Sequence, residues 1–222
     1  MPDLTLEDLV RNGTMSPEMA ATLASAGAGR HSFVCVAIPR QAGKSTVMRA
    51  ILAEAPHGTP MHQLSEAHGV GLGIPLDDDG GYLLVSEISP AGFYEYLWGR
   101  PVQRVFGALD RGFSLATALH ASGVEEAFEV ICGYNGIPDE QAARIDLIVY
   151  IEVFRVRGAG VARRVAAVYE IDGVEDGVPR ARLLHQHQAE DDTFEVVEAP
   201  RLLDTGPAHR KRLARFRAAL EG

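Results

Sequence analysis

The sequence contains very little lysine. Among 21 basic residues only Lys44 and Lys211 are lysines, so arginine carries almost all of the positive charge. Acidic residues outnumber basic ones, 30 to 21, which gives a net charge of −9 at pH 7. An acidic balance of this size argues against a general nucleic-acid binder. Lysine at a defined position is therefore informative in this chain.

Cysteine and long apolar runs are scarce as well. Cys35 and Cys132 lie far apart, which gives no metal-ligand spacing and suggests a reducing cytoplasm. The chain has no apolar run of about 18 residues and no basic segment followed by an apolar one at its start. We therefore expect a cytoplasmic protein with no direct membrane insertion, which reaches the inner face of a membrane only through partners.

One stretch combines the scarce lysine with a recognisable pattern. Phe33–Ile38 is mostly apolar and predicts a buried strand, whereas Val47–Leu52 predicts an amphipathic helix. Between them lies Gly43-Lys44-Ser45. Strand, tight loop, Gly-Lys-Ser and helix are typical of a phosphate-binding loop.

The chemistry of such a loop assigns roles to its residues. Backbone N–H groups at the start of the helix face an anion, which the helix dipole favours. Lys44 is expected to reach the β- and γ-phosphates, and the Ser45 hydroxyl to bind Mg²⁺. The first glycine of the usual G-x-x-x-x-G-K-[ST] pattern falls on Ile38. The predicted nucleotide-binding residues are Pro39, Arg40, Gln41, Ala42, Gly43, Lys44, Ser45 and Thr46.

Two further apolar strands have polar groups near their carboxyl ends. Glu87 belongs to the strand Tyr82–Ile88, and His120 follows Phe113–Leu119. Ligands of open α/β sheets bind beyond this edge. Glu87 is therefore a candidate to orient or deprotonate water, and His120 to sense a γ-phosphate. A strand-end acid that merely meets solvent is the alternative for Glu87, and Thr117 is a further candidate residue.

The remaining segments complete an α/β pattern. Residues 1–30 predict a lead-in of two short helices, residues 31–175 a nucleotide-binding domain, and residues 176–222 C-terminal strands with a basic helix. Within these parts we expect solvated turns at Asp77–Gly81 and Gly158–Gly160, a largely helical stretch over 89–112, a hairpin of Ile145–Phe154 with Arg163–Ile171, strands at Met61–Glu66, Arg180–His185 and Thr193–Val197, and a solvated or subunit-facing helix at His209–Arg217.

In this order the motifs resemble the secretion and pilus-assembly ATPases, which are the type II/type IV traffic ATPases including the tight-adherence pilus ATPases. The resemblance covers roughly residues 4–172. The matching segments are Leu6–Ala26 (helical lead-in), Ala37–Thr46 (Walker A), Glu66 (acidic box), Leu83–Ile88 (Walker B), Phe113–Ala121 (histidine box), and Asp146–Ile151 with Arg163–Val165 (closing hairpin).

Several positions depart from the pattern of that family. Ile38 and Gln41 replace glycines of the Walker A loop, and Ser86 replaces the glycine before the acid. Ser89 stands where an arginine commonly follows Walker B. Glu66 is one carboxylate of a usual pair, and the family's separate N-terminal domain has no counterpart in this sequence.

The resemblance implies a RecA-like P-loop NTPase core: α/β, a mainly parallel central sheet with helices on both faces, and an antiparallel C-terminal extension. It also implies ATP and Mg²⁺ as cofactors and ATP hydrolysis that powers secretion or pilus assembly. Glu87 and His120 would be catalytic, with Arg163 or Arg164 neutralising charge in the transition state. The expected partners are copies of itself in a hexameric ring and membrane platform proteins. A degenerate, non-hydrolysing regulatory relative and a small-molecule kinase are the alternatives.

Overall fold

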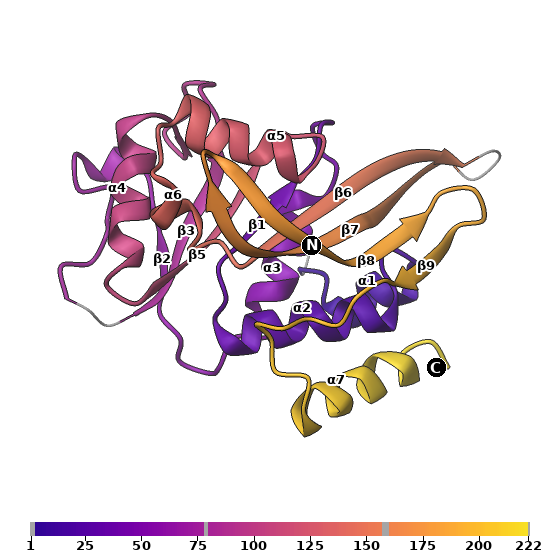
Figure 1. The fold of residues 1–222 in the computed structure, drawn as a ribbon. Helices are drawn as coiled ribbons and strands as arrows, with labels where there is room; N and C mark the ends of the chain where they lie inside the picture. The colour runs from indigo at the N-terminus through magenta and orange to yellow at the C-terminus, as the bar shows by residue number, and fades with distance from the viewer. Residues whose placement is uncertain (1–2, 78–79, 157–159, 222) are drawn as a thin grey trace.

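The computed structural model describes residues 3–77, 80–156 and 160–221 (Figure 1). Asp78, Asp79, Gly158 and Ala159 of the two predicted turns lie outside these ranges. The elements are α1 Leu6–Arg11, α2 Pro17–Gly29, β1 Phe33–Val36, α3 Lys44–Leu52, β2 Met61–Gln63, the 3₁₀ helix η1 Glu66–His68, β3 Gly81–Ile88, β4 Tyr96–Leu97, α4 Arg100–Leu109, β5 Phe113–Leu119, α5 Val124–Phe128, the π-helix η2 Glu129–Tyr134, α6 Asp139–Ala142, β6 Leu147–Val156, β7 Gly160–Glu175, β8 Val178–Gln188, β9 Thr193–Val196 and α7 Pro207–Ala218.

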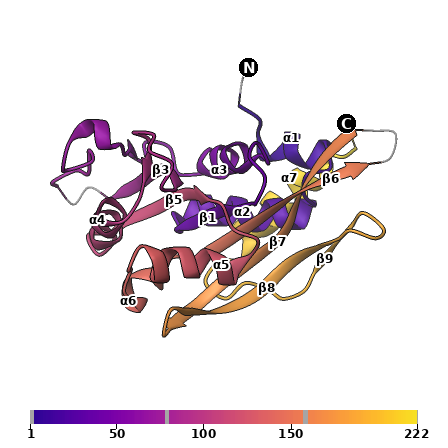
Figure 2. The ribbon, with the colours of Figure 1, turned by 90° about the horizontal axis from the view of Figure 1, so that it is seen from above.

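All the strands belong to one sheet in the order β2-β3-β5-β1-β6-β7-β8-β9, with β4 paired to the end of β3. The strands from β2 through β6 in this order pair in parallel. From β6 onward the pairing is antiparallel. The predicted architecture, a mainly parallel α/β sheet with an antiparallel C-terminal extension, is confirmed. Figure 2 shows the β6–β7 and β8–β9 hairpins reaching out on the side where α1 lies.

Strand β1 lies inside the parallel part and is buried on both faces. Phe33 and Cys35 belong to a core formed with α1, α2, α3 and α7. Val34 and Val36 belong to a second core formed with α4, α5 and α6. The two cores arise because successive strand residues point to opposite faces. Burial raises the pKa of the Cys35 thiol to about 12, so this cysteine stays protonated and unreactive.

Two helices precede β1, in the segment 1–30 where the sequence predicts two short helices. Helix α1 starts with a capping box, in which Thr5 and Asp8 each satisfy a backbone N–H of the other. Ser16 caps α2 by accepting from the Met19 N–H, and Pro17 occupies the first turn. These local signals explain why this part of the fold follows from sequence alone.

The prediction of helix across residues 89–112 is wrong for its first half. Only α4 is helical, and Tyr96–Leu97 instead form β4, which pairs with Glu87 and Ile88 of β3. A two-residue strand carries no periodic signal, and its pairing partner is distant in sequence. The consequence is that Tyr96 is placed directly beside Glu87.

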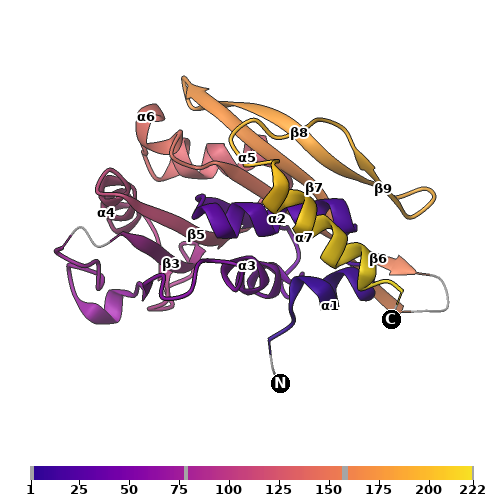
Figure 3. The ribbon, with the colours of Figure 1, turned by 90° about the horizontal axis from the view of Figure 1, so that it is seen from below.

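The predicted basic helix is α7, and it packs on the helices of its own chain (Figure 3). Phe216 is fully buried, and the His209 ring bonds to the Ser25 hydroxyl of α2 at 3.1 Å. Arg215 forms ion pairs with Glu7 and with Glu54, which follows α3. Across the boundary expected at residue 175 the sheet continues, because β7 pairs with β8. Within the described ranges, no helix combines the length and apolarity required to cross a bilayer.

Candidate functional site

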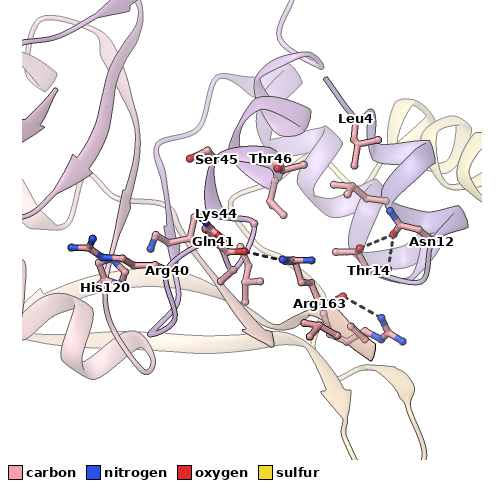
Figure 4. A pocket seen from close by; sticks show the side chains of 18 of the residues that line it. Leu4, Asn12, Thr14, Arg40, Gln41, Lys44, Ser45, Thr46, His120 and Arg163 are labelled. Carbon is pink, nitrogen blue, oxygen red and sulfur yellow. Dashed lines mark hydrogen bonds between the residues drawn. The ribbon is translucent and has the colours of Figure 1, made fainter. Parts of the chain in front are cut away.

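A cavity of about 890 Å³ lies beside the loop that joins β1 to α3 (Figure 4). Its walls come from residues far apart in sequence. They are Arg40 to Val47 of the loop and α3; Leu4, Leu9, Asn12 and Thr14 around α1; Glu87, Tyr96 and His120 at the carboxyl ends of the parallel strands; and Ile151, Val161, Ala162, Arg163, Arg164 and Asp192 of the antiparallel strands and their turns. A cavity therefore lies at the carboxyl ends of the parallel strands, where the sequence predicts a ligand-binding site.

The loop between β1 and α3 turns without a glycine at position 38. Ile38 lies outside the left-handed backbone region, and its side chain is 51% exposed rather than lining the cavity. Gln41 has φ 60° and Gly43 φ 101°, so the sharp turns fall on these two residues. A left-handed glutamine costs about 1 kcal/mol relative to glycine. The isoleucine at position 38 therefore does not obstruct the cavity.

Most residues of the loop line the cavity, and one is exposed to solvent instead. The predicted binding residues Arg40 through Thr46 line the cavity, whereas Pro39 is exposed and does not. Helix α3 begins at Lys44, so its first backbone N–H groups are free to meet an anion. The Ser45 hydroxyl lies in the same turn. Magnesium in nucleotide sites takes one or two protein oxygens together with phosphate oxygens, and Ser45 fits that role.

Lys44 is the buried cation of the site. Its ammonium lies 3.5 Å from Glu87 Oε2, and the side chain is only 7% exposed. Burial lowers the pKa of Lys44, while the Glu87 carboxylate opposes that shift. A cation with little water around it and one partner at 3.5 Å is well prepared to accept an anionic ligand.

His120 connects the two strand ends. Its Nε2 lies 3.2 Å from Glu87 Oε1, and its Nδ1 lies 2.9 Å from the Ile38 carbonyl oxygen. A carbonyl only accepts, so Nδ1 carries a proton and donates to it. His120 thus fixes the loop after β1 to the acid of β3 and presents its ring at the cavity.

Glu87 points into the cavity because β3 is irregular there. The pairing of β3 with β5 shifts between Val85 and Ile88, which leaves an extra residue on β3. Such bulges redirect a side chain, and they occur next to active sites. On its other side Glu87 pairs with Tyr96 of β4. The carboxylate is 11% exposed and faces both Lys44 and His120.

The neighbouring arginines of β7 have different partners. Arg163 is exposed, and its Nε donates to the Gln41 carbonyl of the loop at 3.0 Å (Figure 4). Arg164 donates two bonds of 2.8 Å to the Asp192 carboxylate. These bonds raise the pKa of Arg164 and, with a bond from His187, hold the pKa of Asp192 far below its usual range. Arg163 faces the loop, whereas Arg164 is engaged in an ion pair.

Two candidate residues lie away from the cavity. Thr117 is wholly buried in β5, where its hydroxyl donates to the Ala118 carbonyl, and Glu66 is exposed in η1. The cavity also has polar residues that the sequence did not indicate: Asn12, Thr14, Tyr96 and Asp192. They come from turns and a minimal strand, and only the folded chain brings them to this place.

No family model matches the chain, and no curated protein matches it. Among solved structures it is similar to the VirB11 ATPase from the Brucella suis type IV secretion system, at 17% identity and a TM-score of 0.47, over 76% of this chain and 57% of that one. It is also similar to the Legionella pneumophila ATPase DotB, at 12% identity and a TM-score of 0.44, over 100% of this chain and 59% of that one. The chain spans less than two thirds of the length of either structure. Likenesses this distant carry no argument about function.

Proposed function

We propose that this chain binds ATP with Mg²⁺ in the cavity and hydrolyses it. Lys44 and the backbone N–H groups at the start of α3 hold the phosphates, and Ser45 holds the metal. Glu87 activates the attacking water, His120 contacts the γ-phosphate, and Arg163 neutralises charge that develops in the transition state. Mg²⁺, when bound, withdraws charge from the phosphate oxygens.

The observation that carries this proposal is the contact between Lys44 and Glu87. The only lysine outside α7 lies 3.5 Å from Glu87 of β3, a strand separated from β1 by β5, inside a cavity large enough for a nucleotide. An ordinary strand-to-helix turn would leave such a lysine in solvent. Here the lysine is buried, and burial lowers its pKa. The negative charge of an incoming phosphate would oppose that shift.

The cellular role is inferred from the motifs that resemble the secretion and pilus-assembly ATPases. We infer a RecA-like motor subunit that works as a homo-oligomeric ring, in the cytoplasm at the inner face of a membrane. Its partners would be platform proteins of a secretion or pilus system. A ring that forms in the presence of ATP, measured by light scattering, would support this role.

A non-hydrolysing relative that only binds ATP is the second candidate, and one observation favours it. Both carboxylate oxygens of Glu87 already have partners in the chain, because Oε2 lies 3.5 Å from the Lys44 ammonium and Oε1 lies 3.2 Å from His120 Nε2, so neither oxygen is free to hold a water. Purified protein that binds ATP without any Glu87-dependent phosphate release would establish this second function.

The test of nucleotide binding uses both lysines of the chain. Lys44→Ala should weaken binding of Mg·ATP by at least about 100-fold, because the phosphates lose a buried charged donor. Lys211→Ala removes the same side chain from the exposed surface of α7 and should leave affinity unchanged. Calorimetric titration measures both. Equal ATP affinity in Lys44→Ala and in the parent chain would refute the assignment of the loop.

A further inference from the structure

The cavity continues from the phosphate loop to the turn between α1 and α2. At the far end lie Asn12 and Thr14, with Leu4 nearby on the α1 side (Figure 4). Leu9, Ile151 and Val161 also line the cavity. A slot with apolar walls and a few placed polar groups is the usual form of a site for a flat, partly polar ring. None of the phosphate chemistry proposed above uses this end.

The amide of Asn12 has a fixed orientation. Its Oδ1 accepts from the Thr14 backbone N–H at 3.1 Å and from the Thr14 hydroxyl at 2.6 Å. An amide whose oxygen is occupied in this way presents its NH₂ group as a donor only. The Thr14 hydroxyl, having given its proton to Asn12, keeps its oxygen as an acceptor. The turn therefore offers one donor beside one acceptor.

Residues of strand β7 contact this turn and fix its position. The Val165 N–H of β7 donates to the Thr14 carbonyl at 2.8 Å. The Arg164 guanidinium lies beside the turn, where a Cβ on Gly13 would be in ordinary van der Waals contact with its Cζ at 3.8 Å. Because Asp192 fixes Arg164 with two bonds, the turn is held in position before any ligand arrives.

We propose that Asn12 and Thr14 read the base of the bound nucleotide and make the site selective for adenine. The Asn12 NH₂ group donates to N7, and the Thr14 oxygen accepts from the 6-amino group. Guanine presents acceptors at both of these positions, so it meets the Thr14 oxygen with a second acceptor. Arg164 is accordingly a positioning residue for this turn. The inference rests on the proposed nucleotide binding at the loop.

The test compares three ligands on the full chain with Mg²⁺: ATP, GTP and tripolyphosphate. ATP should bind at least tenfold more tightly than either of the others, because one unpaired polar group in a specific site costs about a factor of ten or more. Calorimetry is suitable because it requires no turnover.

Two variants separate the base contact from the shape of the turn. Asn12→Asp keeps an oxygen that accepts both Thr14 bonds but replaces the free donor with an acceptor. Its advantage for ATP over tripolyphosphate should fall below threefold, while the tripolyphosphate affinity itself reports the effect of the added charge. Thr14→Ser keeps the hydroxyl and should retain the preference for ATP.

The outcomes distinguish this inference from the function on which it rests. If the parent chain binds GTP as tightly as ATP, or if Asn12→Asp keeps the full advantage for ATP, base reading by this turn is refuted while phosphate binding stands. If neither ATP nor tripolyphosphate binds the parent chain, the proposed function fails, and base reading fails with it.

Discussion

The parallel strands and the antiparallel hairpins meet the cavity from different sides. From the parallel side come Lys44, Glu87 and His120, each in a segment at the carboxyl end of a strand. From the antiparallel side come Arg163, Arg164 and Asp192, whose bonds run to backbone, to each other and to His187. The side chains of the parallel side contact one another at the cavity, whereas Arg163 of the antiparallel side also bonds to the loop that forms a wall of it.

The two parts of the sheet contribute to the cavity in different ways. The carboxyl ends of the parallel strands and the loops after them lie together, so the polar groups of Lys44, Glu87 and His120 converge there. A long antiparallel hairpin instead reaches past that edge and bonds to loops belonging to other elements. Arg163 holds the Gln41 carbonyl, and Val165 holds the carbonyl of Thr14. Substitutions on the two sides should therefore differ in how they change turnover and stability.

The largest effect is expected at Glu87. Glu87→Gln preserves the size of the side chain but removes the base, so kcat for ATP hydrolysis should fall by about 10²- to 10⁴-fold. Binding of ATP should persist because the loop is untouched. Phosphate release and calorimetric titration on the same preparation measure both quantities. Undiminished turnover in this variant would remove Glu87 from the mechanism.

The adjacent arginines test whether the antiparallel side supplies only support or also a group for the chemistry. Arg163→Ala should lower kcat by up to about 10³-fold with little change in Tm, because the side chain is exposed and faces the loop. Arg164→Ala should lower stability by about 1 kcal/mol, since Asp192 is more than half exposed and solvent screens the pair. Turnover and thermal melting are measured for both.

Each of the two arginine variants is the control for the other. They remove the same chemical group from consecutive positions of β7, so general effects of lost charge cancel. If Arg164→Ala abolished turnover at unchanged Tm while Arg163→Ala did not, the roles assigned to these residues would be reversed.

An effect on stability alone, with no role in the cavity, is expected at His185 of β8 on the antiparallel side. This ring is 2% exposed and bonds to the Thr22 hydroxyl of α2 at 2.8 Å. Burial lowers its pKa from 6.5 to about 4. Between these two values the unfolded chain binds the extra proton, so stability is fully present above about pH 6.5 and is lost as the pH falls toward 4. The loss is at most roughly 3 kcal/mol.

Urea unfolding at pH 7.5 and at pH 5 measures this loss. His185→Gln removes the titrating ring and should flatten the pH dependence over this window. His57→Gln, at an exposed position, should leave the dependence as it is in the parent chain. A pH dependence that survives His185→Gln would show that another group causes it.

The sequence predicted the parallel side of the site better than the antiparallel side. Strand β1, helix α3 and the positions of Glu87 and His120 follow from apolar runs that end in polar residues, which is a local signal. Tyr96 and Asp192 have no such signal, because a two-residue strand and a hairpin turn place them. The choice between Arg163 and Arg164 was open because adjacent strand residues differ only in the face they occupy.

The structure also explains why the missing glycine matters less than the pattern suggests. At position 38 the backbone does not need a left-handed conformation, and the turn is made at Gln41 and Gly43 instead. The usual pattern has a glycine at the position of Ile38, but the backbone of this loop needs a left-handed conformation only at Gln41 and Gly43.

The most direct measurement is a crystal structure of the Glu87→Gln variant soaked with ATP and Mg²⁺. We expect the triphosphate in the turn before α3, with Lys44 Nζ within hydrogen-bond distance of its terminal oxygens, the metal on Ser45, and His120 beside the γ-phosphate. Nucleotide bound elsewhere on the chain, or an occupied cavity in which Lys44 does not contact phosphate, would contradict the account.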